Sequence, residues 1–229
     1  MARISVIRCG ASKGKGKGMT GIIILGAYGQ VARLVRSRLL QEKDAHLTLF
    51  LRRSERITDA DPERETVVEG DVNDYAALVE AVKGQDVVYA NLGGRFEPMA
   101  ANIVRAMDAD GVRRLIYVTG LGLYHEVPGE FGRWIEESCG HEVMEDTRRA
   151  AAIIEDSDVN YTIIRAAYMD DAADTDYETT CKGKLFRGTT ISRASIADYI
   201  MRLLADQQLD NRSSVGIDRP GTDADRPMW

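Results

Sequence analysis

The sequence predicts an α/β fold in which a doubly wound parallel sheet carries helices on both faces, as a single domain. Three observations support this prediction. Short aliphatic runs such as residues 22–25 (IIIL) are typical of parallel strands that are buried on both faces. Amphipathic segments with helical spacing alternate with these runs along the chain. The length of 229 residues suits one large α/β domain, so a second domain is not required.

The alternation defines the expected elements. Strands are expected at residues 22–25, 47–51, 66–69, 86–90 and 115–119. Helices are expected from residue 30 onward and over about residues 74–82, 98–109 and 192–204. Asn73 or Asp74 is suited to cap the second of these helices, and Ser195 the last. The tail over residues 212–229 is expected to cross the surface.

A glycine turn follows the first expected strand. Gly26 allows the tight turn, Gly29 lets the backbone approach a pyrophosphate, and Ala32 lets the next helix pack closely on the strand. The helix that starts at Gln30 then directs its N-terminal N–H groups at the phosphates. A simple tight turn would also fit the motif alone, but strand, turn and helix stand in the required order. We therefore predict a dinucleotide-binding domain of Rossmann type.

Two arginines stand at the end of the second expected strand, where an acidic residue would bind the ribose 2′-hydroxyl of NAD. The sequence at this point is Arg52-Arg53-Ser54. Guanidinium groups favour the 2′-phosphate of NADP, because they donate charge-assisted hydrogen bonds to it. The alternative is that both arginines are solvated charges at a strand end. We predict NADP(H) rather than NAD(H) as the cofactor.

The charge of the chain excludes several classes of partner. The formal net charge is −6 at pH 7, and every acidic residue lies beyond residue 18, so nucleic-acid binding is not expected. No apolar run approaches the length of a membrane span, about 18 residues. The three cysteines are widely spaced and form no CxxC pair, which predicts no zinc site and favours a cytoplasmic location.

Residues 1–18 are basic and include the low-complexity stretch GASKGKGKG. Glycine entropy and repulsion between the lysines oppose a packed element, so a disordered leader or a non-native start is expected. Met19 stands directly before the first strand, which favours a vector leader or an upstream start codon over a targeting peptide. The domain itself is expected over residues 19–229.

Several segments of the chain together resemble the atypical short-chain dehydrogenases/reductases, in particular the NmrA-like NAD(P)-binding group. The segments are ILGAYGQVAR, GDVNDYAALVEAVKGQDVVYANLGG, RRLIYVTGLGLY, DVNYTIIRAAYMDD and ISRASIADYIMRLL, and the resemblance covers about residues 20–220. It implies one Rossmann domain of about seven parallel strands, with the cofactor across the strand ends. It also implies a substrate pocket built from the segments at about residues 120–142 and 166–190.

The resemblance assigns cofactor contacts residue by residue. The phosphates would be held around the glycine turn, the 2′-phosphate at the second strand, the adenine after the third strand, the ribose after the fourth, and the nicotinamide near the end of the fifth. Gly26, Tyr28, Gly29 and Gln30 would contact the phosphates, and Arg52 and Arg53 the 2′-phosphate. Asp71 and Val72 would contact the adenine, and Asn91, Leu92 and Gly93 the ribose. Thr119 and Gly120 would lie near the nicotinamide.

The chain lacks the catalytic tyrosine and lysine that are typical of the wider superfamily. Many reductases there use a Tyr-x-x-x-Lys pair, in which the lysine lowers the tyrosine pKa and the tyrosine passes a proton to the carbonyl oxygen. No tyrosine here is followed four places on by lysine. By spacing, the tyrosine position falls near Met144, the lysine position near Arg148, and the helper serine or threonine position near Gly120. Ordinary carbonyl reduction is therefore not expected.

Aromatic residues dominate the expected substrate segments. Leu121, Trp134, Tyr168 and Met169 are predicted to line the pocket, a composition that suits a flat acceptor such as a flavin, quinone or tetrapyrrole. Residues 121–134 are expected to form a polar, glycine-containing loop, in which Tyr124 and His125 are the candidate proton donors. The alternatives are that the tyrosine packs in a lid and that the histidine is an exposed loop residue.

No metal site is predicted. The pair His141 and Glu142 lacks the second histidine of an HExxH motif, and the acidic cluster of residues 170–178 lacks calcium-loop spacing, so it is expected to be a solvated loop. The favoured function is NADPH-dependent reduction of a small aromatic or quinonoid acceptor. The alternatives are a non-catalytic NADP sensor that acts on a protein partner and an epimerase-like or dehydratase activity.

Overall fold

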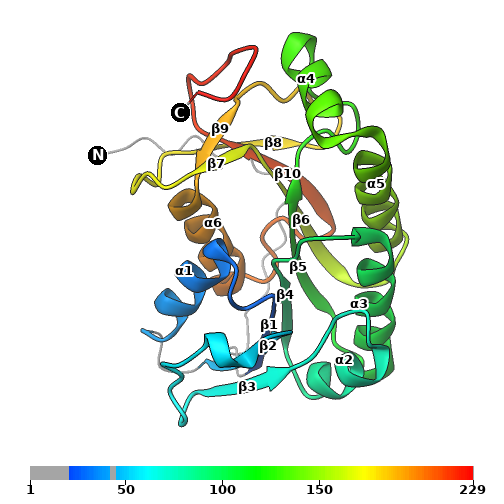
Figure 1. The fold of residues 1–229 in the computed structure, drawn as a ribbon, viewed down its shortest axis with the longest axis vertical. Coiled ribbons are helices and arrows are strands. Elements are labelled where there is room, and N and C mark those ends of the chain that lie inside the picture. Colours follow the sequence, from blue (N-terminus) through cyan, green and yellow to red (C-terminus); the bar gives the residue numbers. More distant parts are fainter. Residues whose placement is uncertain (1–20, 42–44, 229) are drawn as a thin grey trace.

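The computed structural model describes residues 21–41 and 45–228, so the predicted leader over residues 1–18 lies outside the described residues. The described chain forms one α/β domain around an eight-stranded sheet, with a separate two-stranded sheet at one edge (Figure 1). The predicted fold class is confirmed. The elements, in chain order, are β1 (Gly21–Leu25), α1 (Gln30–Leu39), β2 (His46–Leu51), η1 (Ser54–Arg56), β3 (Glu65–Glu69), α2 (Tyr75–Val82), β4 (Val87–Ala90), α3 (Phe96–Asp110), β5 (Arg114–Gly120), α4 (Gly129–Cys139), α5 (His141–Glu155), β6 (Asn160–Ala166), β7 (Tyr168–Asp170), β8 (Glu178–Cys181), β9 (Thr190–Ser192), α6 (Arg193–Ala205) and β10 (Ser213–Asp218).

The strand order of the large sheet is β3-β2-β1-β4-β5-β6-β10-β8. All neighbours from β3 to β10 are parallel, as predicted, and only the edge strand β8 pairs antiparallel, with β10. The chain winds outward from β1 through β2 to β3 and then returns to β4 on the other side of β1. This reversal leaves a crevice outside the carboxyl ends of β1 and β4, which is where ligands of open α/β sheets bind.

Helices cover both faces of the sheet. Figure 1 shows α2, α3 and α5 on one face and α1 with α6 on the other. Alternate residues of β1 therefore serve different cores: Ile22 and Ile24 belong to the cluster under α1 and α6, whereas Ile23 and Leu25 belong to the other cluster. This two-sided burial explains the unbroken aliphatic run. Among the described helices, none is long and apolar enough to cross a membrane.

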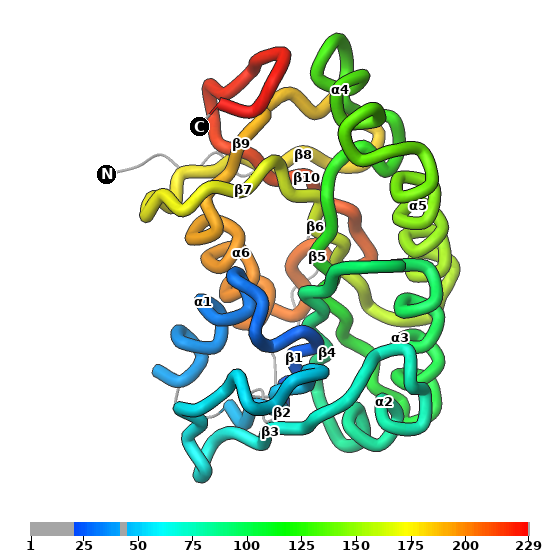
Figure 2. Tube along the Cα trace, viewed as in Figure 1, coloured from blue at the N-terminus to red at the C-terminus, as the bar shows by residue number. Residues whose placement is uncertain are grey.

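The C-terminal tail was expected to cross the surface, and this prediction is wrong over residues 213–218. This segment is β10, which lies inside the sheet between β6 and β8 and buries Val215 and Ile217 (Figure 2). The short stretch SSVGID contains few apolar residues, so its sequence pattern is weak. Only its neighbours β6 and β8 define it as a strand, because they provide the partners for its backbone hydrogen bonds.

Two helix starts also differ from the expectation. The last helix, α6, has Ser192 rather than Ser195 as its N-cap, since the Ser195 N–H donates to the Ser192 hydroxyl at 2.9 Å. The segment from Leu121 to Trp134 was expected to be a loop, but α4 begins within it at Gly129. Positive φ at Gly129 (70°) lets the chain turn into this helix.

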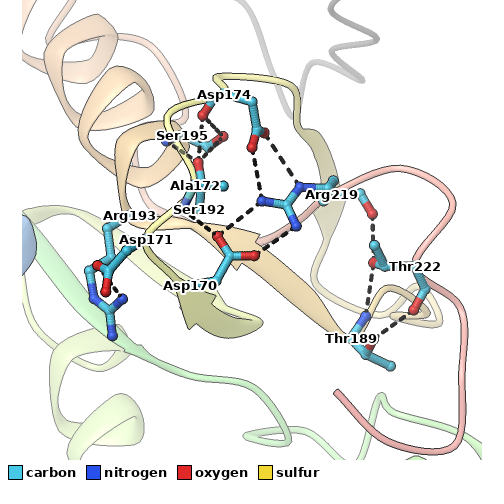
Figure 3. A network of polar contacts seen from close by, with 10 residues as sticks. All are labelled: Asp170, Asp171, Ala172, Asp174, Thr189, Ser192, Arg193, Ser195, Arg219 and Thr222. Carbon is cyan, nitrogen blue, oxygen red and sulfur yellow. Dashed lines mark hydrogen bonds and ion pairs between the residues drawn. The ribbon is translucent and has the colours of Figure 1, made fainter. Parts of the chain in front are cut away.

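The acidic cluster after β6 is an exposed loop over residues 171–176, as expected, but ion pairs fasten it at Asp170 and Asp174. Figure 3 shows Arg219 between Asp170 and Asp174, and its guanidinium contacts the two carboxylates at 2.7 and 2.9 Å. The Ser192 hydroxyl donates to the Asp174 carbonyl oxygen at 2.6 Å. Arg219 also donates its backbone N–H to the Thr190 carbonyl oxygen of β9. The end of β10 therefore holds β7 and β9 together above the carboxyl edge of the large sheet.

Candidate functional site

The glycine turn lies against the end of β4. Gly26 has φ of 80°, and a Cβ atom there would lie 2.3 Å from the Asn91 carbonyl oxygen. A Cβ atom on Gly29 would lie 2.0 Å from Nδ2 of the Asn91 side chain. Gly26 therefore has no room for a larger residue, because the neighbouring atom is backbone, whereas a larger residue at Gly29 would displace the Asn91 side chain. The turn is therefore held close to the crevice between β1 and β4, as a pyrophosphate-binding turn requires.

The N-terminus of α1 is open to an anion. Its N-cap residue, Gly29, provides no side-chain hydrogen bond, and no acidic residue lies in the first turn. By contrast, Asp74 caps α2, and Asp146 of α5 accepts the Phe96 N–H at the start of α3 at 2.5 Å. The first N–H groups of a helix carry partial positive charge and need acceptors. A bound phosphate would satisfy those of α1.

Four arginines lie after β2 or beside the glycine turn, where the adenosine is predicted. Arg52 and Arg53, directly after β2, are exposed, and their side chains form no ion pair or hydrogen bond with any residue that the structure describes. Tyr28 of the glycine turn lies under two more guanidinium groups, those of Arg33 at 5.0 Å and Arg56 at 4.9 Å from its ring centre. The strand ends thus present concentrated positive charge on a chain whose net charge is negative.

The acids near these arginines have other partners. The Glu69 carboxylate at the end of β3 accepts hydrogen bonds from the Ser54 hydroxyl at 2.5 Å and the Ser54 N–H at 3.1 Å, and these bonds lower the pKa of Glu69. Asp71 accepts the backbone and side-chain N–H groups of Asn73, both at 2.9 Å. Val72 beside it is buried. Neither carboxylate neutralises Arg52 or Arg53 in this structure.

The ends of β4 and β5 complete the predicted cofactor positions. Leu92 packs against the core, whereas a Cβ atom at Gly93 or Gly120 would have no neighbour within 4 Å. The Thr119 side chain is buried, and its Oγ1 has no hydrogen-bond partner among the described residues. A buried hydroxyl without a partner is costly, so a ligand that hydrogen-bonds to it gains affinity. These features fit a dinucleotide whose nicotinamide lies near the end of β5.

The positions of the missing acid and lysine are occupied by structural side chains. Met144 is buried, and its Cε lies 2.8 Å from where a Cβ atom of Gly122 would be. Arg148 donates to the Gly122 carbonyl oxygen at 2.9 Å and to Glu145 at 2.7 Å, and it also pairs with Glu136. The turn after β5 therefore packs directly on α5 at the place where a catalytic tyrosine and lysine would stand.

The two candidate donors of this turn have different surroundings. Tyr124 donates its hydroxyl to Glu155 near the end of α5 at 2.8 Å, and the Lys182 ammonium lies 4.2 Å from its ring centre. Burial is the main cause that raises the pKa of Tyr124 above its ordinary value. His125 is exposed, has φ of 54°, and its Nδ1 lies 3.4 Å from Nη2 of Arg148. Their roles as proton donors stay predictions.

The predicted pocket residues gather around one apolar cluster. Leu121 is buried in the cluster under α1 and α6, and Trp134, Tyr168 and Met169 pack against it. The ring centres of Trp134 and Tyr168 are 4.9 Å apart, and Phe131 stacks on Trp134 at 6.0 Å. These contacts join α4 to β7, so the two predicted pocket segments meet. The residues form a packed wall, and their contact with an acceptor stays a prediction.

A buried ion pair that the sequence reasoning missed shapes the turn. Arg165 of β6 is fully buried and donates to Glu126 at 2.6 Å, while Glu126 accepts the N–H groups of Gly122 and Tyr124 at 3.1 and 2.8 Å. Burial would raise the pKa of Glu126, but the Arg165 charge and these hydrogen bonds lower it below its ordinary value. An arginine inside the apolar run YTIIRAAY is the signal that a buried partner exists.

Comparison with known proteins finds relatives that bind NAD(P). Residues 26–207 match the family model described as NAD(P)H-binding. A Rossmann-fold NAD(P)-binding family protein from Shigella flexneri is 37% identical, with a TM-score of 0.79 over 92% of this chain and 99% of that chain. A short-chain dehydrogenase/reductase from Veillonella parvula DSM 2008, solved in complex with NADP, is 30% identical, with a TM-score of 0.84 over 92% of this chain and 100% of that chain.

A curated relative matches over a shorter part. Phenylcoumaran benzylic ether reductase IRL1 from Ginkgo biloba is 30% identical over 137 residues, which are 55% of this chain and 40% of the Ginkgo protein. The family model, by contrast, spans most of the domain and begins at Gly26 of the glycine turn. The resemblance to short-chain dehydrogenases/reductases is confirmed, and the chain belongs to the NAD(P)H-binding family.

Proposed function

We propose that the protein is an NADPH-dependent oxidoreductase that reduces a small planar acceptor, aromatic or quinonoid in character. The preference for NADPH over NADH is proposed from Arg52 and Arg53. Both are exposed after β2, and neither has an ion-pair partner among the described residues. A 2′-phosphate at this position would accept charge-assisted hydrogen bonds from both. The 2′-hydroxyl of NAD would leave both charges without a partner.

The remaining cofactor contacts follow from the strand ends. The turn from Gly26 to Gly29 and the open start of α1 would hold the pyrophosphate, and the Thr119 hydroxyl would bond the nicotinamide end. The bound nicotinamide would supply a hydride to the acceptor. In this proposal, the residues of the chain bind and orient the two molecules.

The class of acceptor is proposed from the side chains around the turn after β5. Met144 and Arg148 are engaged in packing and in ion pairs, and the Tyr124 hydroxyl is bonded to Glu155. A reaction that needs a strong protein acid is therefore disfavoured, whereas hydride transfer to a flat conjugated ring depends mainly on orientation. The aromatic wall formed by Trp134 and its neighbours supports this acceptor class.

Calorimetric titration with NADPH and NADH tests the cofactor choice. We expect NADPH to bind at least ~tenfold more tightly, a difference of about 1.4 kcal/mol. The double variant Arg52→Ala, Arg53→Ala should remove the preference, whereas Arg187→Ala, which removes an exposed arginine after β8, should retain it. Equal affinities in the unchanged protein would overturn the proposal. An acceptor screen that follows NADPH oxidation then tests catalysis.

A second candidate function is a non-catalytic NADP sensor that acts on a protein partner. The observation that favours it is Arg148, which stands at the lysine position but is committed to the Gly122 carbonyl oxygen and to two glutamates. Tight NADPH binding, with no oxidation by any acceptor in the screen, would place this function first. An epimerase or dehydratase would need an acid/base pair, and Met144 and Arg148 do not provide one at the tyrosine and lysine positions.

A further inference from the structure

A cavity of about 360 Å³ lies between the turn after β5 and one face of α4. This volume is in the range of small-molecule sites. Six of the lining residues belong to α4, among them Gly129, Gly132 and Glu136, which are three and four positions apart and share one face of the helix. The lining is Gly122, His125, Val127, Gly129, Gly132, Arg133, Ile135, Glu136 and Glu137.

The cavity lies near the expected hydride donor. Gly122 lines it and follows Gly120, the end of β5, by two residues. Two residues of extended chain span at most ~7 Å, so the cavity begins within that distance of the strand end where the nicotinamide is expected. Trp134, by contrast, is absent from the lining.

The polar groups of the cavity leave one carboxylate without a partner. Arg133 pairs with Glu130, and Glu136 pairs with Arg148. The Glu137 carboxylate has neither a hydrogen bond nor an ion pair within 4.0 Å among the residues that the structure describes, and Arg133 acts on it only as a more distant charge. The cavity therefore presents one carboxylate that makes no direct contact with a cation.

His125 and apolar residues complete the lining. The His125 Nδ1 lies 3.4 Å from Nη2 of Arg148 and 3.8 Å from the Glu136 carboxylate. Val127 and Ile135 add apolar surface, and the glycine backbones add flat walls without side chains. The lining thus combines surface for a planar ring with recognition of positive charge.

We propose that this cavity binds the acceptor of the proposed reaction and that the acceptor is a planar organic cation. The proposal rests on the proposed function. It also explains why no protein acid is needed: the C4–H bond of NADPH breaks, its hydride with two electrons forms a new C–H bond on the cationic ring, and NADP⁺ and a neutral product result. No proton enters the balance. The acceptor is reduced and the nicotinamide is oxidised.

The test uses three probes of one shape: 10-methylacridinium, acridine and acridine-9-carboxylate. Their binding is measured by fluorescence at pH 8 with saturating NADP⁺, so that no reduction occurs. We expect the cation to bind at least ~fivefold more tightly than neutral acridine, as one partly enclosed ion pair of about 1 kcal/mol allows, and the anion to bind most weakly. Glu137→Gln should remove the advantage of the cation. Glu142→Gln, at an exposed carboxylate outside the cavity lining, should retain it.

Two results overturn the inference: equal affinity for the cation and neutral acridine, or the same loss in Glu142→Gln as in Glu137→Gln. The reaction is then followed as NADPH oxidation by 10-methylacridinium above the uncatalysed rate. If charge-selective binding is found without enzyme-catalysed oxidation, the cavity and its ligand class stand while the proposed reductase function fails. If NADPH is oxidised by neutral acceptors only, the function stands and the cationic acceptor is refuted.

Discussion

Asp218 provides a direct test of the electrostatics at the end of β10. Its side chain is 2% exposed, it faces Glu178 across the antiparallel pair, and its Oδ1 has no hydrogen-bond partner among the described residues. Gly188 lies so close that a Cβ atom there would be 2.0 Å from Oδ2. Burial, followed by the charges of Glu178 and Asp223, raises the pKa of Asp218 to about 8. The folded protein therefore holds a proton on this carboxyl at neutral pH.

The sign of the effect on stability follows from linkage. The unfolded chain releases this proton near its ordinary pKa of 3.8, whereas the folded chain keeps it up to about 8. The stabilising contribution is complete below pH 4 and is lost progressively as pH rises through the folded-state value. Between those limits the loss is about 1.4 kcal/mol per pH unit, hence roughly 3 kcal/mol from pH 5 to pH 7. Asp218→Asn has the same shape and cannot ionise, so it removes this slope.

Urea unfolding followed by circular dichroism at pH 5, 6, 7 and 8 measures the effect. We expect the free energy of unfolding of Asp218→Asn to rise relative to the unchanged protein by about 3 kcal/mol between pH 5 and pH 7. All other groups titrate in both proteins, so the difference isolates this carboxyl. Asp158→Asn, at an exposed aspartate, should show a difference that does not vary with pH. A constant difference for Asp218→Asn as well would refute a raised pKa.

Three further substitutions test the site. Gly29→Val should abolish NADPH binding, measured by calorimetry, because the valine side chain would displace Asn91 and fill the pyrophosphate position. The circular dichroism spectrum should stay unchanged. Retained binding in the folded variant would make the turn purely structural. Tyr124→Phe should lower kcat less than ~tenfold, because the lost hydroxyl bonds Glu155; a fall of ~a hundredfold or more would identify a general acid. Trp134→Ala should reduce kcat/KM at least ~tenfold and stability by about 3 kcal/mol, because it removes the Phe131 and Tyr168 contacts that position α4 beside the acceptor; unchanged kcat/KM and stability would show that these contacts do not position α4.

Local sequence patterns predicted most of the nucleotide-binding half. The glycine turn, the strand before it and the helix after it are properties of adjacent residues, so the sequence displays them directly. The same holds for the cap of α2, which is Asp74, one of the two predicted candidates. The exposed position of Arg52 and Arg53 followed in the same way from the end of one apolar run. These features depend on backbone geometry and burial within a few residues.

The substrate side was less predictable because its elements depend on distant partners. The segment SSVGID is a strand only because β6 and β8 flank it, and Arg219 after it fastens Asp170 and Asp174 from a separate part of the chain. In the same way, Arg165 and Glu126 are charged residues whose burial is stable only because each is the other's partner. The periodicity of residues within one segment does not predict contacts with a distant segment.

The sequence alone determined the fold class, the dinucleotide turn and the absence of a Tyr-x-x-x-Lys pair, because each is a pattern of neighbouring residues. The tertiary structure alone decided that Arg148 holds the Gly122 carbonyl oxygen, that Tyr124 points to Glu155, and that the α4 residues lining the cavity do not include Trp134. The physical reason is that hydrogen bonds and ion pairs form between side chains that the fold brings together. Such pairings are long-range, and the local pattern that defines a strand or helix does not contain them.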